Sequence, residues 1–477
     1  MASPTKLDLP KTDAIVVGSG PNGMAAAIRM AQAGWSVLLI EGAQVPGGGV
    51  RSAELTLPGF IHDICSSVYP LTVCSPFFRN LSLEKYGLEM VFPQAALAHP
   101  FDDGTAAILH RSLEETEATL GRDGDNYRKL IAGFIPRWKD LLDDALAPIG
   151  FPRHPFFFAG FGRQAIRSAR GIAYAYFRTE HARTFFGGMA AHSLLPLEKL
   201  TTAGAGMMLA ILGHAVGWPF VRGGAQQLTN ALLQLFRSLG GQFVTGCFVE
   251  SLDQLPPARV VLLDVTPRQL LKIAGDRLPQ SYQRKLSRFR YGMGVFKLDW
   301  ALHHPIPWRA SECAQAGTVH LSGTLDEICD SERSSWEGKA CERPFVLLSQ
   351  ASLFDSTRAP AGKHTAWAYC HVPNGHNGDM TGAIENQIER FAPGFRECIA
   401  ARSAMSPADL ERRNPNLVGG DIGGGAAMLS QLFLRPTASL YRTPLKGVYL
   451  CSSSTPPIAG VHGMCGYFAA ETALKRS

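Results

Sequence analysis

The sequence of 477 residues lacks a long, uninterrupted apolar segment. The nearest candidate, residues 201–220, is broken by glycine, histidine and proline, and its apolar run is shorter than the roughly 20 residues that cross a bilayer. It predicts a buried helix or a channel wall instead. Dense runs of lysine and arginine with interleaved aromatic residues are also missing, and the net charge is only +6. Nucleic acid is therefore not an expected partner.

The spacings that mark cysteine chemistry are absent as well. The ten cysteines are scattered, no two of them have CxxC spacing, and no Cys/His group has the spacing of zinc ligands. We therefore expect free thiols and no metal site. The sequence opens without a recognisable secretory leader, which favours a reducing, cytoplasmic location.

What the sequence does contain is enough apolar material for more than one core. Hydrophobic residues make up 46% of the chain and charged residues 18%, and the chain is longer than one core usually supports, so we expect two domains. Residues 76–215 have a mostly helical pattern, whereas several β-rich stretches follow Tyr291. Residues 382–404 predict an amphipathic helix that Pro393 kinks or splits.

A strand–turn–helix–strand pattern opens at Asp13 and runs to about Ser52. A short apolar run is followed by GSGPNG, by an alanine-rich helix, and by a second apolar run that ends at Glu41. This is the order of a Rossmann-type unit, in which the glycines permit a tight turn, close approach of a pyrophosphate, and close helix–strand packing. The unpaired N–H groups at the helix start favour the phosphates, and the carboxylate accepts the ribose hydroxyls. The residues expected to hold the dinucleotide here are Gly18, Gly20, Pro21, Asn22, Gly23 and Glu41.

The residues after Glu41 indicate which dinucleotide binds. They are Gly42, a glycine cluster at 47–49, and PGF-x-x-D at 58–63. This arrangement resembles the two-dinucleotide-binding-domain flavoproteins, the superfamily of amine oxidases and phytoene desaturases. The closer resemblance is to the phytoene desaturase branch and its bacterial NAD(P)/FAD-dependent relatives. These relatives are known as pyridine nucleotide-disulfide oxidoreductase domain-containing protein two-like proteins. The resemblance implies FAD as the cofactor.

The same resemblance assigns further cofactor contacts. In the family, paired glycines lie beside the flavin, a strand end holds the ribityl chain, and the last helix starts facing the ring. Here serines, Ser452 and Ser453, stand at the strand end, and Gly49 stands where the family often has arginine. The residues that the resemblance places at FAD are Gly42, Gly48, Gly49, Arg51, Ser52, Val249, Ser453, Val461, His462 and Gly463. Residues 264–267 match the family after its third strand.

These motifs together predict an α/β fold in which a Rossmann-type FAD-binding domain is interleaved with an α+β substrate domain. We expect residues 1–75, 216–275 and 436–477 to form the first domain, and residues 76–215 and 276–435 the second. The N-terminal unit, the 221–270 segment and the tail would share one sheet. A second GxGxxG is absent, so a dedicated NAD(P)H domain is not expected. The glycine-rich run 418–428 is expected either to pack close to substrate or flavin or to be a flexible loop.

The first candidates for acid–base chemistry are four histidines, His192, His214, His371 and His462. Tyr291 and Tyr369 rank after them. Only His462 is placed by a flavin motif, so it is the catalytic candidate, although it could equally shape the flavin pocket. For the other three, a structural role is the ordinary expectation.

The substrate is expected to be hydrophobic. Aromatic patches at 154–162 and at Phe185–Phe186 indicate a lipophilic path or a peripheral membrane contact, or alternatively the ordinary core of a helical cap. The resemblance implies an FAD-dependent oxidoreductase that dehydrogenates, saturates or isomerises a polyene- or isoprenoid-like molecule, with oxygen or a quinone as electron acceptor. The alternatives are an amine oxidase-like flavin oxidase and a non-enzymatic flavin-binding regulatory protein.

Overall fold

The computed structural model describes residues 9–432, 434–457 and 459–476. A five-stranded parallel sheet joins segments from both ends of the chain, in the order β16-β10-β1-β2-β9. The strands are β1 (Ala14–Val17), β2 (Val37–Ile40), β9 (Gln242–Val244), β10 (Val260–Leu263) and β16 (Val448–Leu450). The strand order confirms that the N-terminal unit, the 221–270 segment and the tail share one sheet, and the fold class is the predicted one.

Helices cover both faces of this sheet, which is why its central strands are apolar at every position. One face packs against α1 (Pro21–Gln32), α10 (Gln226–Ser238) and α17 (Met464–Leu474). The other face packs against α11 (Pro267–Ala274) and α12 (Gln280–Ser287). Helices α1 and α17 approach closely, because a Cβ at Gly466 would collide with the backbone of Asn22.

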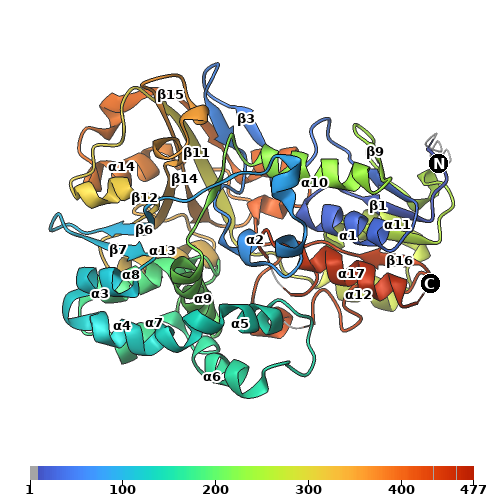
Figure 1. Cartoon of the computed structure of the whole chain (residues 1–477), viewed down its shortest axis with the longest axis horizontal. Helices are drawn as coiled ribbons and strands as arrows, with labels where there is room; N and C mark the ends of the chain where they lie inside the picture. Colours follow the sequence, from blue (N-terminus) through green and yellow to red (C-terminus); the bar gives the residue numbers. More distant parts are fainter. Residues whose placement is uncertain (1–8, 433, 458, 477) are drawn as a thin grey trace.

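A second sheet of seven strands lies beside the first, in the order β15-β11-β14-β13-β12-β6-β7 (Figure 1). Its strands are β6 (Ala95–Pro100), β7 (Ala106–His110), β11 (Gly294–Leu302), β12 (Ala316–Leu321), β13 (Val346–Ser349), β14 (His364–Val372) and β15 (Ile399–Met405). All neighbours are antiparallel except β12 and β6, which run parallel. Two small ribbons, β3 (Ser52–Glu54) with β4 (Ile61–Asp63) and β5 (Met90–Val91) with β8 (Phe220–Val221), complete the strands.

A helical layer covers one face of the second sheet, and α14 (Thr381–Phe391) packs on the other. The layer contains α3 (Leu113–Leu120), α4 (Gly124–Ile131), α5 (Trp138–Ala145), α6 (Pro155–Ala165), α7 (Ala169–Tyr176), α8 (Glu180–Ala191), α9 (Thr202–Ala215) and α13 (Leu325–Trp336). The shorter helices elsewhere are α2 (Pro70–Cys74), α15 (Pro407–Arg413) and α16 (Leu429–Leu432). In the part of the chain that the structure describes, no helix has the length and apolar character needed to span a bilayer.

One prediction of secondary structure was wrong, and another held with an exception. Residues 76–215 are mostly helical, as expected, but residues 95–100 and 106–110 within them form β6 and β7. The helix expected over 382–404 ends at Phe391, and residues 399–405 form the edge strand β15, which pairs with β11. In both places alanine-rich sequence has helical propensity, and pairing with a neighbouring strand overrides it.

The interleaving of domains is visible in the cores. Residues of 276–435 were expected in the substrate domain, and most of them lie in or around the seven-stranded sheet. Helix α12, however, packs in the same core as the parallel sheet. The domain boundaries themselves stay predictions.

Candidate functional site

A single large cavity of about 1320 Å³ runs from the carboxyl ends of the parallel strands to the second sheet and its helical layer. This volume exceeds the 300–1,000 Å³ of an ordinary small-molecule pocket, so a dinucleotide and a substrate fit together. Residues from both domains line it, as expected for a ligand at the carboxyl edge of an open α/β sheet. Twelve of the predicted cofactor residues line this one cavity: Gly18, Gly20, Pro21, Asn22, Glu41, Gly42, Gly48, Gly49, Arg51, Val249, Ser453 and Val461.

The glycine turn after β1 has the geometry that a bound pyrophosphate requires. Gly18 has φ +99°, a conformation that L side chains rarely adopt, and a Cβ at Gly23 would collide with the carbonyl of Gly18. Gly20 precedes α1 and has no side chain to cap it, and the start of a helix favours an anion. The buried Asn22 Oδ1 has no hydrogen-bond partner among the described residues.

A carboxylate stands at each neighbouring strand end. Glu41, after β2, accepts hydrogen bonds from the N–H of Ser19 at 2.9 Å and of Ala43 at 2.8 Å. Asp264, after β10, accepts the N–H of Gly23 at 3.0 Å. Burial raises the pKa of the Asp264 carboxyl to about 7, and the Glu41 carboxylate acts in the same direction. Asp264 belonged to the motif match at 264–267, but its contact with the glycine turn was not predicted.

The second glycine cluster packs directly on the first. A Cβ at Gly48 would lie 3.0 Å from the Cα of Gly20. Arg51 is buried and donates from Nε to the carbonyl of Gly48 at 2.8 Å and from Nη2 to that of Arg413 at 2.9 Å. Ser52 does not line the cavity, because its hydroxyl donates to Asp63 at 2.8 Å.

The tail closes the cavity from the other side. Ser453 and Val461 line it, whereas the Ser452 hydroxyl donates to the carbonyl of Val265 at 2.7 Å. His462 and Gly463 lie outside the lining. His462 is fully buried, and its Nδ1 accepts the N–H of Met464 at 3.0 Å, so it caps α17. This contact is structural, and the catalytic assignment of His462 stays a prediction.

The glycine-rich run 418–428 also forms part of the wall. The buried Asp421 carboxylate accepts the N–H groups of Gly292 at 2.7 Å, Gly423 at 2.7 Å and Gly425 at 2.8 Å, which fixes the path of the loop. Gly424 packs so closely on Ser453 that any side chain would clash with its hydroxyl. The run therefore forms part of the cavity wall, and its contact with substrate or flavin stays a prediction.

A parallel sheet with a glycine turn, a ribose carboxylate and an anion-binding helix start defines a dinucleotide-binding protein, and the attached antiparallel sheet makes it a two-domain flavoprotein. The chain belongs to the FAD dependent oxidoreductase family, whose model matches residues 13–271. Its cofactor is FAD, whose pyrophosphate fits the helix start and the close-packed glycines of this turn.

Among relatives, the chain is 25% identical to pyridine nucleotide-disulfide oxidoreductase domain-containing protein 2 of Rattus norvegicus, over 98% of this chain and 94% of that protein. It is also 25% identical to the lycopene-forming phytoene desaturase of Pantoea ananas, over 96% and 98% of the two chains. Among solved structures, putrescine oxidase bound to putrescine superposes with a TM-score of 0.62 at 18% identity, over 98% and 99% of the two chains. That likeness concerns the fold.

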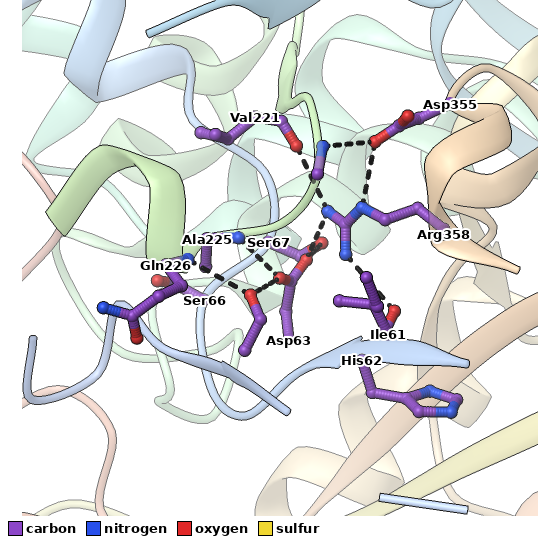
Figure 2. A network of polar contacts seen from close by, with 12 residues as sticks. Ile61, His62, Asp63, Ser66, Ser67, Val221, Ala225, Gln226, Asp355 and Arg358 are labelled. Atoms are coloured by element: carbon purple, nitrogen blue, oxygen red, sulfur yellow. Dashed lines mark hydrogen bonds and ion pairs between the residues drawn. The ribbon is translucent and has the colours of Figure 1, made fainter. Parts of the chain in front are cut away.

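A buried ionic cluster fixes the two domains beside the cavity (Figure 2). The Arg358 guanidinium donates to Asp63 at 2.9 Å and to Asp355 at 3.1 Å, and all three side chains are almost fully buried. Asp63 also accepts the N–H of Ala225 at 2.7 Å, at the start of α10. Burial alone would raise the pKa of the Asp63 carboxyl, but Arg358 and these hydrogen bonds hold it below its ordinary value. The cluster, which the sequence did not indicate, joins β4, α10 and the substrate domain.

The remaining acid–base candidates divide into two groups. His192 and Tyr369 line the cavity. His214 is held by the Tyr127 hydroxyl at 2.9 Å, and His371 is bound to Glu332 at 2.7 Å; neither lines the cavity. The Tyr291 hydroxyl donates to Thr266 and also lies outside the lining. Within the described residues, no group of histidine, cysteine and acidic side chains could hold a metal ion, and all ten cysteines are free.

Proposed function

We propose that this protein is an FAD-dependent dehydrogenase or saturase of a hydrophobic small molecule, with a polyene or isoprenoid as the substrate class. The observation that carries the proposal is the continuity of the cavity. The space that starts at the glycine turn continues without a wall into a region lined by the helical layer and the second sheet. A substrate in that region would reach the flavin without passing through water.

The walls of the far region favour an apolar ligand. They carry side chains such as Phe158, Phe161, Met208, Leu209 and Trp218. Helix α9 contributes two of them, and its first turns face the cavity, which agrees with the prediction of a buried helix or channel wall for 201–220. The name of one relative points the same way, since it is a lycopene-forming phytoene desaturase.

When bound, FAD accepts or donates a hydride. The residues of this chain would bind the cofactor through the glycine turn and Glu41, orient the substrate against the aromatic wall, and exclude water from the reacting carbons. Exclusion of water strengthens every electrostatic contact within the site. Oxygen or a quinone is the proposed final electron acceptor.

Anaerobic flavin reduction tests this proposal. The purified holoenzyme is mixed with lipid and polar cell extracts, and the loss of flavin absorbance is followed spectrophotometrically. We expect a lipid fraction to reduce the flavin, and mass spectrometry of that fraction then identifies the substrate. Reduction by amines with release of hydrogen peroxide in air would instead establish the amine oxidase-like alternative. A flavin that dithionite reduces would favour the non-enzymatic alternative if no extract reduces its oxidised form and no extract oxidises its reduced form.

A further inference from the structure

Three buried histidines form a row that starts at the wall of the substrate region. His192 follows α8 and lines the cavity. Its Nε2 lies 3.0 Å from the Nε2 of His320 on β12. His320 and His99, on β6, are fully buried, and their rings stand 6.3 Å apart at 88°.

The sheet register and one glycine bring the row together. Strands β12 and β6 run parallel with Val319 opposite Ala98, so the next residues, His320 and His99, lie side by side. Gly188, one turn before His192 on α8, packs on both rings. A Cβ there would lie 2.8 Å from the Nδ1 of His320 and 3.1 Å from the Nδ1 of His99. The two Nδ1 atoms therefore face the same small space.

The fixed end of the row determines where each proton lies. His99 Nε2 lies 2.9 Å from the carbonyl oxygen of Ser322, which can only accept, so this nitrogen carries the hydrogen. Burial lowers the pKa of His99 to about 4, that of His192 to about 3 and that of His320 well below its ordinary value, so all three rings are neutral near pH 7. The His99 Nδ1 is then a bare acceptor.

The positions of the remaining ring hydrogens follow because two nitrogen lone pairs that face each other repel. Neither Nδ1 has a hydrogen-bond partner among the described residues, and a hydrogen on the His320 Nδ1 removes one of the two lone pairs that face this space, which leaves the His320 Nε2 as an acceptor. That Nε2 is 3.0 Å from His192 Nε2, which must therefore donate. The Nδ1 of His192 is left bare. It has no hydrogen bond and is not among the buried unpaired atoms of the described residues, so it is open to the cavity.

From this geometry we propose that His192 is the proton-exchanging residue of the substrate region, held in its basic tautomer by His320 and His99. The inference rests on the proposed function. In dehydrogenation, one C–H bond of the substrate breaks and its hydrogen leaves as a hydride to FAD, the oxidant. The neighbouring C–H bond breaks, its electron pair forms the C=C bond, and its proton passes to His192 Nδ1.

The tautomer is tested directly by NMR on the wild-type holoenzyme labelled with ¹⁵N-histidine. Long-range ¹H–¹⁵N correlations distinguish the protonated ring nitrogen from the bare one, and the His192 signals are assigned by their absence from His192→Gln or, should that variant fold poorly, from His192→Asn. We expect the hydrogen of His192 on Nε2 near pH 7. A hydrogen on Nδ1 would overturn the proposal, whatever the substrate is.

The kinetic test uses the extract fraction that reduces the wild-type flavin. His192→Gln keeps a donor toward His320 but removes the base, so we expect its flavin to be reduced 10²- to 10⁴-fold more slowly by that fraction and at the wild-type rate by dithionite. His320→Leu, which removes the acceptor that orients His192, should show a smaller loss and a changed His192 tautomer. His214→Gln, a buried histidine outside the cavity, should keep the wild-type rate.

The two proposals fail in different ways. Equal rates for wild type and His192→Gln with the active fraction would overturn the role of His192 and leave the proposed function standing. The absence of any active fraction would count against the proposed function, while the NMR result would still decide the tautomer.

Discussion

A carboxyl group lies at the glycine turn that receives the FAD pyrophosphate. Asp264 Oδ2 accepts the N–H of Gly23, and a side chain at Gly20 would come within 2.6 Å of it. Its pKa is raised to about 7 by burial, so the folded protein holds a proton there that the unfolded chain releases near pH 4. The apoprotein should therefore lose stability as the pH rises from about 4 to about 7. Once Asp264 is ionised, its negative charge would repel that of the pyrophosphate.

We predict that Asp264→Asn weakens the pH dependence of FAD binding. At pH 8 the wild-type Asp264 carboxyl must take up a proton before FAD binds without repulsion. This cost lowers the affinity of the protein for FAD about tenfold relative to a variant with a neutral side chain. Asparagine keeps an acceptor for Gly23 without the charge. Titrations of the apoprotein that follow FAD fluorescence at pH 6 and pH 8 measure the effect. A variant whose affinity falls with pH as steeply as that of the wild type would contradict the prediction.

At the scale of elements, the Arg358 cluster connects β4, the start of α10 and the substrate domain. Removing the cation leaves the buried Asp63 carboxylate without an ion pair and leaves Asp355 only the longer contact with Arg222, at 3.8 Å. We predict that Arg358→Met lowers the free energy of unfolding by about 3–5 kcal/mol, measured by urea denaturation at pH 7. Arg277→Met, which breaks an exposed pair with Asp253, should change it by less than about 1 kcal/mol. Similar losses in both variants would refute the special role of the buried cluster.

The contact between α1 and α17 is a second test at this scale. A methyl group at Gly466 would collide with the Asn22 backbone and push α17 away from the helix that binds the phosphates. We predict that Gly466→Ala destabilises the protein by roughly 1–3 kcal/mol and lowers its FAD content. Gly382→Ala, on α14 with no atom within 4 Å of the new methyl group, should leave flavin content unchanged and raise stability slightly. Thermal unfolding and the flavin-to-protein absorbance ratio measure both.

The sequence predicted those elements whose signal is local. Gly18, Gly20 and Glu41 stand at fixed spacing around one turn, and their places in the cavity agree with that spacing. The strands β6 and β15 were missed because their alanine-rich segments pair with partners far away in the chain, and β7 was missed with β6, with which it forms a hairpin. The Arg358 cluster and the histidine row were missed for the same reason. Each joins residues that only the folded sheets bring together.

At the scale of the whole molecule, exposed apolar side chains surround the helical end of the cavity. Phe185 and Phe186 are fully buried core, as one expectation for the aromatic patches had it, but Phe156 on α6 is 93% exposed and Phe151 just before it is 89% exposed. Phe151 lines the cavity, and the exposed Arg153 stands between the two phenylalanines. Figure 1 shows α6 at the outer edge of the helical layer. Phenylalanines with interspersed cations suit an anionic membrane surface.

We predict that the protein binds vesicles containing anionic lipid through this end. The double substitution Phe151→Ser with Phe156→Ser should reduce co-sedimentation with such vesicles at least fivefold, because it removes most of the exposed aromatic area. Phe92→Ser, an exposed phenylalanine away from the cavity, serves as the matched control. Binding that is equally strong in the double variant, or absent in the wild type, would contradict this prediction.

The cofactor sheet takes strands from the first 40 residues and from residues 448–450, and the last segment also supplies Ser453 and Val461 to the cavity wall. A nascent chain that still lacks these residues has the glycine turn but neither β16 nor this part of the cavity wall. We therefore expect FAD to bind only after residues 448–461 have been synthesised.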